Sequence, residues 1–243
     1  MRLAAFDLET AKILPPNVTD LKQHMPLGIS CAAIALSDAE EPEVWSGSPQ
    51  LTADECGQLV DRLQALVAAG YTLVTWNGAS FDFFVLAQES GRTEDCGQLA
   101  LDHADLMVMV TFNKGYFLGL DKALAGAGLQ GKVKSVALRD GTLLSGMSGA
   151  QAPALWKAGE HEAVIAYLKG DVAQLLALAE VVERTRVIRW LSNRGKPQSA
   201  QVKTLLTVSE CFQIPEPDTS WMSNAPTRSS FVDWIPGWVN KVG

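Results

Sequence analysis

Residues 27–36 (LGISCAAIAL) constrain the fold more than any other part of the chain, because this run of ten residues carries no charge. It is too short to cross a membrane and too uniformly apolar for a strand with one face in water. The run therefore predicts a central strand that is covered on both sides. A strand of that kind needs a full core. The chain can supply one, since 47% of its residues are hydrophobic and 19% are charged, which excludes a mostly disordered protein.

The first part of the chain predicts further strands, at residues 2–7, 43–45 and 71–76. Thr52 followed by Glu55 is a capping-box pattern, so a helix is expected to start there and to end near Gly70. A second helix is expected to start near Phe81, directly after the turn that begins at Asn77, and to end at Gly91. Helical segments at residues 93–112 and 118–127, a hairpin around residues 140–141 and a long helix over residues 160–192 complete the expected elements. Strands mainly precede helices, which favours a mixed α/β fold.

The net charge and the cysteine content limit the classes of function that the chain can have. A net charge of −7 argues against a protein that binds nucleic acid by bulk charge, but it allows an enzyme whose acidic residues gather in a metal site. The four cysteines are scattered, without a Cys-x-x-Cys pattern, so we do not expect a zinc site. We expect reduced thiols in a cytoplasmic setting. We see neither a membrane-spanning run nor a signal-peptide pattern.

The most informative residues are acidic and far apart in the chain. Asp7 and Glu9 stand two apart on the first strand, so both carboxylates project from one face, where they suit Mg²⁺ or Mn²⁺. Asp82 falls in the first turn of a helix, where a carboxylate is more often a simple cap. Tyr167 and Asp171 stand four apart on the long helix and share one of its faces. A hydrogen-bonded surface pair is the plainer explanation for those two.

Taken in order, the three patterns resemble the three motifs of the DEDD superfamily of 3′–5′ exonucleases, which have a ribonuclease H-like fold. Residues 6–10 (FDLET) resemble the first motif, residues 77–82 (NGASFD) the second and residues 167–171 (YLKGD) the third. The tyrosine is typical of the DEDDy branch, which includes the proofreading domains of family B DNA polymerases; the histidine branch would have His where this chain has Ala166.

The resemblance implies a metal-dependent 3′–5′ exonuclease that hydrolyses phosphodiester bonds with two divalent ions, Mg²⁺ or Mn²⁺. It implies that Asp7, Glu9 and Asp171 hold one ion, and that Asp7 and Asp82 hold the other. Tyr167 would orient the attacking water. The terminal nucleotide would lie against Leu8, Thr10, Asn77 and Phe81. The expected substrates are single-stranded or frayed 3′ ends, with DNA favoured over RNA, and no membrane is involved.

The resemblance divides the chain into a ribonuclease H-like exonuclease domain, residues 1–193, and an irregular C-terminal extension, residues 194–243. Aromatic residues crowd the extension, and we expect it to wrap the body, although exposed rings could also stack on bases or receive a protein partner. A basic stretch from Arg184 to Lys203 is either a solvated face or a docking site for phosphates.

Three alternatives stay open. The protein could be a non-catalytic module with this fold that binds nucleic acid or protein, because a fold alone does not determine function. It could also be a nuclease directed at RNA, or one that selects a nucleic-acid structure. His103 and Asp105 could support the site, although a helix cap is the simpler interpretation of this pair.

Overall fold

A mixed five-stranded sheet forms the centre of the protein. The structure, a computed structural model, describes residues 1–15, 18, 21–131 and 135–242. The sheet has the order β3-β2-β1-β4-β5, made from β1 (Arg2–Thr10), β2 (Ile29–Leu36), β3 (Glu43–Ser46), β4 (Tyr71–Thr75) and β5 (Ala104–Asp105). The pairs β1–β2 and β2–β3 are antiparallel, whereas β1–β4 and β4–β5 are parallel. This topology confirms the predicted fold class, a ribonuclease H-like mixed sheet flanked by helices.

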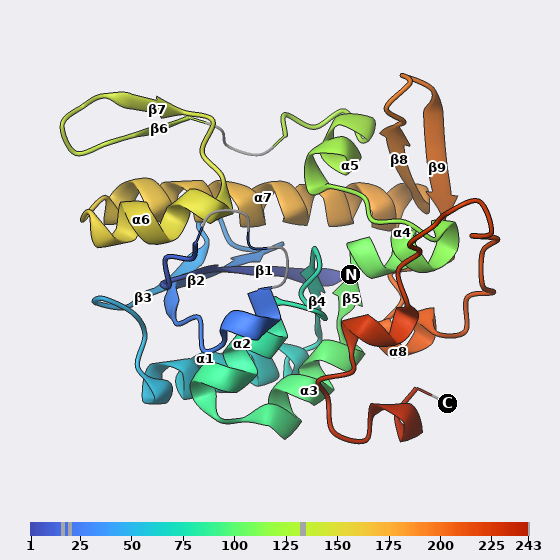
Figure 1. Ribbon diagram of the computed structural model, residues 1–243, viewed down its shortest axis with the longest axis horizontal. Helices are drawn as coiled ribbons and strands as arrows, with labels where there is room; N and C mark the ends of the chain where they lie inside the picture. Colours follow the sequence, from blue (N-terminus) through green and yellow to red (C-terminus); the bar gives the residue numbers. More distant parts are fainter. Residues whose placement is uncertain (16–17, 19–20, 132–134, 243) are drawn as a thin grey trace.

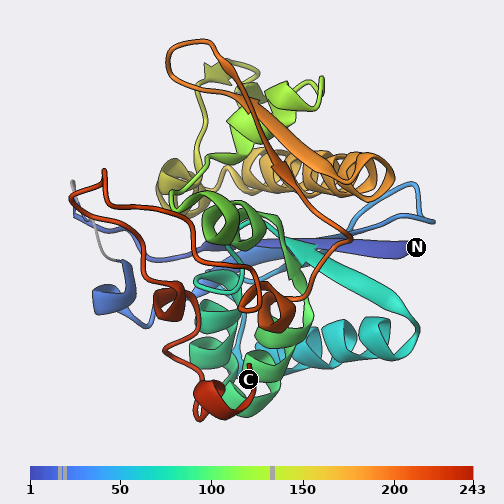
Figure 2. The same ribbon diagram turned by 90° about the vertical axis from the view of Figure 1, so that its right-hand side faces the viewer.

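Helices cover both faces of the sheet (Figures 1 and 2). On one side lie α1 (Ala53–Ala68), α2 (Asp82–Ser90) and α3 (Thr93–Asp102), and on the other lies α7 (His161–Thr185), which packs across β1 and β2. All eight residues of β2 are buried, so the prediction of a strand covered on both sides is confirmed. The capping box at the start of α1 is confirmed too, because Thr52 N donates to Glu55 Oε2 at 2.8 Å and Glu55 N donates to Thr52 Oγ1 at 3.3 Å.

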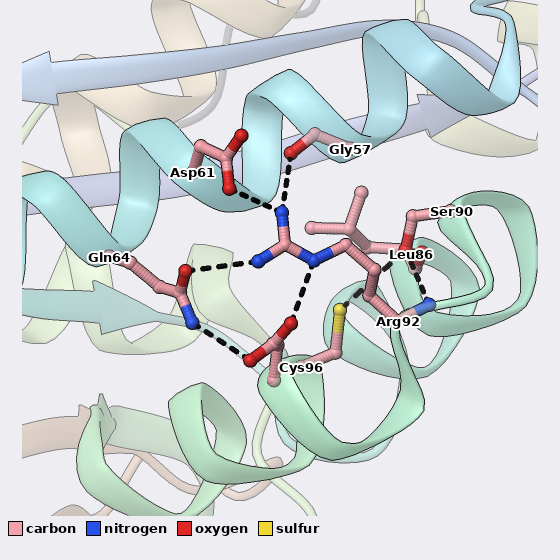
Figure 3. A network of polar contacts seen from close by, with 8 residues as sticks. Gly57, Asp61, Gln64, Leu86, Ser90, Arg92 and Cys96 are labelled. Atoms are coloured by element: carbon pink, nitrogen blue, oxygen red, sulfur yellow. Dashed lines mark hydrogen bonds and ion pairs between the residues drawn. The ribbon is translucent and has the colours of Figure 1, made fainter.

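One arginine ties the three helices of the lower layer together (Figure 3). Arg92, just before α3, donates to Asp95 Oδ2 at 2.7 Å and forms an ion pair with Asp61 on α1. It also donates to the Gly57 carbonyl and to Gln64 Oε1, each at 3.1 Å. Because the guanidinium presents its donors in a rigid fork, these bonds fix the turn after α2 against α1.

Two predictions of continuous helix were wrong. Residues 93–112 form α3, then the short strand β5, then α4 (Leu106–Lys114). Strand β5 exists because residues 104–105 pair with Val74 and Thr75 of β4, a tertiary contact that local sequence does not show. The long helix ends at Thr185 instead of reaching residue 192, because Arg186 adopts a left-handed conformation with φ 58°. The chain then forms β8 (Val187–Leu191), which pairs antiparallel with β9 (Pro197–Gln201).

The remaining segments lie around this core. They are the 3₁₀ turn η1 (Leu21–His24), α5 (Leu120–Gly126), the predicted hairpin of β6 (Ser135–Ala137) and β7 (Leu143–Ser145), η2 (Gly149–Gln151), α6 (Ala152–Lys157) and α8 (Val208–Cys211). Among the described residues, no helix combines the length and the apolar character that crossing a membrane would require.

The chain after α8, residues 212–242, is called the C-terminal segment; its described residues are irregular apart from two 3₁₀ turns, η3 (Arg228–Phe231) and η4 (Trp238–Asn240). It runs along the body, and Figure 2 shows it passing beside α4 and the lower helices. Phe231, Val232 and Ile235 are at most 2% exposed. Their burial makes the segment part of the folded core. The expected domain boundary at residue 193 falls in the turn of the β8–β9 hairpin.

Candidate functional site

The central strand carries two acidic side chains at its carboxyl end. Asp7 is partly exposed, and Glu9 is only 6% exposed. Their cross-strand partners on β2 are Ala33 and Cys31, both small side chains. Alternate residues of a strand project from one face, so the two carboxylates share that face. Two acidic groups are thus held on a rigid strand at the middle of the sheet.

Asp82 begins α2 and lies beside this pair. Its side chain is 4% exposed, and burial is the main cause that raises its pKa well above the ordinary value. The negative charge of Asp7 and a hydrogen bond with Asp7 raise the pKa further, so the two carboxyls are in contact. Within the part of the chain that the structure describes, Asp82 Oδ1 is buried without a hydrogen-bond partner. A cation bound here would stabilise the ionised form of Asp82 and would give its Oδ1 a partner.

Asp105 holds the turn that leads to Asp82. It caps α4, because its Oδ1 accepts from Met107 N at 2.9 Å and from Val108 N at 3.1 Å. This confirms the interpretation of Asp105 as a helix cap. The same carboxylate also accepts from Asn77 N at 3.0 Å and from Ala79 N at 3.1 Å. The turn therefore gets its shape from a residue of the neighbouring strand β5.

His103, at the C-terminal end of α3, supports the same turn before Asp82. Its Nε2 lies 2.7 Å from Thr75 Oγ1, and its ring contacts Phe83 edge-on with the centroids 4.7 Å apart. Thr75 Oγ1 in turn accepts from Gly78 N at 3.0 Å. Complete burial lowers the pKa of His103, so the ring is neutral at physiological pH. Its role here is structural packing and hydrogen bonding.

The C-terminal segment secures the turn from outside. Trp234 Nε1 donates to the Ala79 carbonyl at 2.8 Å, and its ring packs on Phe84 with the centroids 5.4 Å apart. Lys22 of η1 donates to Ser230 O at 3.0 Å and pairs with Asp233 at 3.3 Å. The segment thus joins the second acidic motif to the loop that follows the first. Sequence reasoning missed this role of Trp234, since no local pattern carries it.

Tyr167 and Asp171 lie one turn apart on the same face of α7 and are 2% and 1% exposed. Because α7 packs across β1, that face is turned towards the sheet that carries Asp7 and Glu9. The burial of both side chains does not fit the plainer explanation, a pair on the protein surface.

A pocket of about 540 Å³ opens at this end of β1. Six of the residues predicted to form the site line it: Asp7, Leu8, Glu9, Thr10, Phe81 and Tyr167. Its other walls are Lys12 and Ile13 after β1, Leu21 of η1, Gly149 of η2 and the start of α6. A Cβ placed on Gly149 would lie 3.3 Å from Glu9 Oε2, so this wall approaches the carboxylate closely. Asp82 adjoins the pocket through Asp7, whereas Asn77 and Asp171 are not among its lining residues.

The electrostatics of the pocket are those of an anionic site. The charges of Glu9 and Asp7 add to burial and raise the pKa of Cys31, behind them on β2, to about 12. In the described part of the chain, no group of three or more His, Cys, Asp or Glu side chains is arranged so that it could hold a metal ion. Asp7 contacts Asp82 and lines the same pocket as Glu9, but the described carboxylates do not gather into such a group.

Two solved structures illustrate the likeness of this chain to known proteins, and both likenesses are weak. No family model matches the chain, and no curated protein matches it in sequence. Among solved structures, the family B DNA polymerase of the hyperthermophilic archaeon Pyrobaculum calidifontis has a TM-score of 0.49 and 21% identity, over 74% of this chain and 24% of that chain. Exonuclease I in its apo form has a TM-score of 0.36 and 15% identity, over 75% of this chain and 42% of that chain. The chain thus spans less than half of either protein, and neither likeness assigns it an activity.

Proposed function

We propose that this protein is a metal-dependent 3′–5′ exonuclease that hydrolyses phosphodiester bonds at nucleic-acid 3′ ends. The observation that carries the proposal is the meeting of three distant motifs at one pocket. Asp7 and Glu9 line it from β1, Tyr167 lines it from α7, and Asp82 of α2 contacts Asp7. Buried carboxylates in contact repel one another, and such groups gather at functional sites, which favours a ligand-binding role for this group.

The donor chemistry fits divalent ions with a preference for oxygen, Mg²⁺ or Mn²⁺. Asp7, Glu9 and Asp171 would hold one ion, and Asp7 with Asp82 the other. The unpartnered Asp82 Oδ1 and the raised pKa of that carboxyl are the features expected where a cation is needed. Bound ions would stabilise the charge on the attacking and leaving oxygens of the phosphodiester.

The protein's own residues would position the substrate. Phe81 and the β1 segment Leu8–Thr10 line the pocket, where they would contact the terminal base and sugar. Tyr167 on the opposite wall would orient the attacking water through its hydroxyl. Asn77, whose N–H donates to Asp105, lies outside the residues that line the pocket and would contact the nucleotide from the α2 side. Proximity and orientation of this kind account for a large part of enzymatic rate enhancement.

Degradation of end-labelled oligonucleotides tests the proposal. DNA and RNA 20-mers, labelled at either end, are incubated with Mg²⁺, Mn²⁺ or EDTA. We expect stepwise loss from the 3′ end with metal only, and faster loss of DNA. The Asp7→Asn variant should lose at least a hundredfold in rate, and Tyr167→Phe should lose rate while it still binds Mn²⁺ by calorimetry.

Asp54→Asn, on the exposed surface of α1, is the matched control and should keep full activity. Undiminished cleavage by Asp7→Asn would remove the site from the mechanism. Oligonucleotide binding without metal-stimulated cleavage would favour a non-catalytic module. Faster loss of RNA, or cleavage within a hairpin substrate, would favour the other nuclease types.

A further inference from the structure

The basic residues of the chain are distributed unevenly. Although the net charge is −7, residues 184–209 contain no Asp or Glu. Four exposed cations of this stretch, Arg189, Arg194, Lys196 and Lys203, stand on or beside the β8–β9 hairpin. Lys122 of the neighbouring helix α5 joins them, because its Nζ donates to Asn193 Oδ1 in the hairpin turn at 2.6 Å. We call these five residues the basic hairpin surface.

In the part of the chain that the structure describes, the cations of this surface contact no acidic side chain. Across the described residues, no ion pair involves any of the five, whereas Arg62, Arg92 and Lys169 elsewhere each contact a carboxylate. What distinguishes this surface is that several cations gather in a stretch without Asp or Glu. A local basic cluster in an otherwise acidic protein suits the phosphates of a nucleic acid.

The hairpin is a rigid support for these charges. Ile188, Trp190 and Ala200 are at most 3% exposed and anchor its inner face. A Cβ on Gly126 of α5 would lie 1.9 Å from the Arg189 carbonyl, so helix and strand are in direct backbone contact. On the outer face Arg189 stands opposite Ser199. Hydroxyl and guanidinium donors side by side suit phosphate oxygens.

We propose that the basic hairpin surface binds the sugar–phosphate backbone of the nucleic acid whose 3′ end enters the pocket. This inference rests on the proposed function, and it extends the substrate well beyond the terminal nucleotides. Helix α7 connects the two places, with Asp171 in its first half and the hairpin after its end (Figure 1). The 15 residues from Asp171 to Arg186 span about 22 Å at 1.5 Å per residue, which corresponds to roughly seven base pairs.

The test compares substrates of different length. The variant with Arg189→Gln, Arg194→Gln and Lys196→Gln has three fewer positive charges, all at exposed positions. Binding of a fluorescent four-nucleotide DNA, a 30-nucleotide DNA and a 30-base-pair duplex with a short 3′ overhang is measured by anisotropy in EDTA, from 50 to 300 mM salt. Removal of metal prevents cleavage, so this readout is independent of the proposed activity.

For the longer ligands we expect the variant to bind about tenfold more weakly at 150 mM salt, with a salt slope lower by about two. The four-nucleotide ligand should bind both proteins equally. With Mg²⁺, KM for the long substrates should rise in the variant while kcat stays unchanged. The triple Arg189→Lys, Arg194→Lys and Lys196→Arg variant retains the charges and should bind like the original protein, as should Lys241→Gln, whose cation is paired with Glu94.

Equal binding of the 30-nucleotide and duplex ligands by the triple Gln variant, with an unchanged thermal melt, would overturn the inference. Competition by polyglutamate as strong as competition by DNA would also overturn it, in favour of an acidic protein partner. Hairpin-dependent DNA binding in a protein that never cleaves DNA or RNA would refute the proposed exonuclease and leave the binding surface standing.

Discussion

Trp234 offers a sharp test of the C-terminal segment as a support for the site. Trp234→Phe keeps a ring beside Phe84 but removes the indole N–H that the Ala79 carbonyl accepts at 2.8 Å. A lost hydrogen bond of this kind costs about 1 kcal/mol, and for a protein of this size that corresponds to a fall of about 2–4 °C in Tm. Trp234→Ala also loses the ring contact and should cost about 3 kcal/mol in total.

Trp221 provides the matched control. Its indole also donates to a backbone carbonyl, that of Asp218 at 3.1 Å, but this side chain is 68% exposed. Trp221→Phe should therefore change the free energy of unfolding by less than about 0.5 kcal/mol. Urea unfolding followed by far-UV circular dichroism measures all three variants without depending on tryptophan fluorescence.

The activity of the folded variants separates support of the site from general stability. Because Ala79 lies in the turn before Asp82, the two Trp234 variants should lose nuclease rate at a temperature where both remain folded. Equal unfolding free energies for Trp234→Phe and Trp221→Phe would refute the assigned role of the hydrogen bond. Full activity of folded Trp234→Ala would refute the support of the site.

Three further outcomes are expected. Asp105→Asn should destabilise the protein by about 2 kcal/mol in urea unfolding and lower the rate of the proposed nuclease, because Asn77 N and Ala79 N donate to different oxygens of Asp105 and an amide keeps only one of them as an acceptor; wild-type values for this variant would contradict the assigned role of the carboxylate. Gly126→Ala should cost about 1–3 kcal/mol because its Cβ meets the Arg189 backbone, whereas Gly57→Ala, with open space around it, should be neutral or stabilising; equal effects in thermal melts would count against this packing. Burial raises the pKa of all four cysteine thiols, to about 11 for Cys56 and about 12 for Cys31 and Cys96, so a disulfide reagent at pH 8 should label none in the native protein and all four in urea; labelling of the native protein would refute their burial.

Local signals predicted most of the sheet. The uncharged run at residues 27–36 gave β2, and the Thr52–Glu55 pair gave the start of α1, because both depend on neighbours in sequence. Strand β5 depends instead on pairing with β4, so a helical prediction continued through it. The end of α7 at Arg186 was missed for a similar reason, since neither Gly nor Pro stands there to mark it.

For the candidate site, spacing identified the acidic residues but not their supports. The period of a strand predicted a shared face for Asp7 and Glu9, and helical spacing did so for Tyr167 and Asp171. The second role of Asp105 depends on the parallel neighbours β4 and β5, which only the folded sheet brings together. Trp234 lies in an irregular segment, where no periodicity exists to be interpreted.

The bond from Trp234 to Ala79 joins residues 155 positions apart, and this has a consequence for the order of events during synthesis. A chain released after α7 would already contain Asp7, Glu9, Asp82 and Asp171. The turn before Asp82 would still lack the hydrogen bond that Trp234 donates to Ala79. If the proposed function is right, products that terminate before Trp234 should cleave nucleic acid more slowly than the full chain.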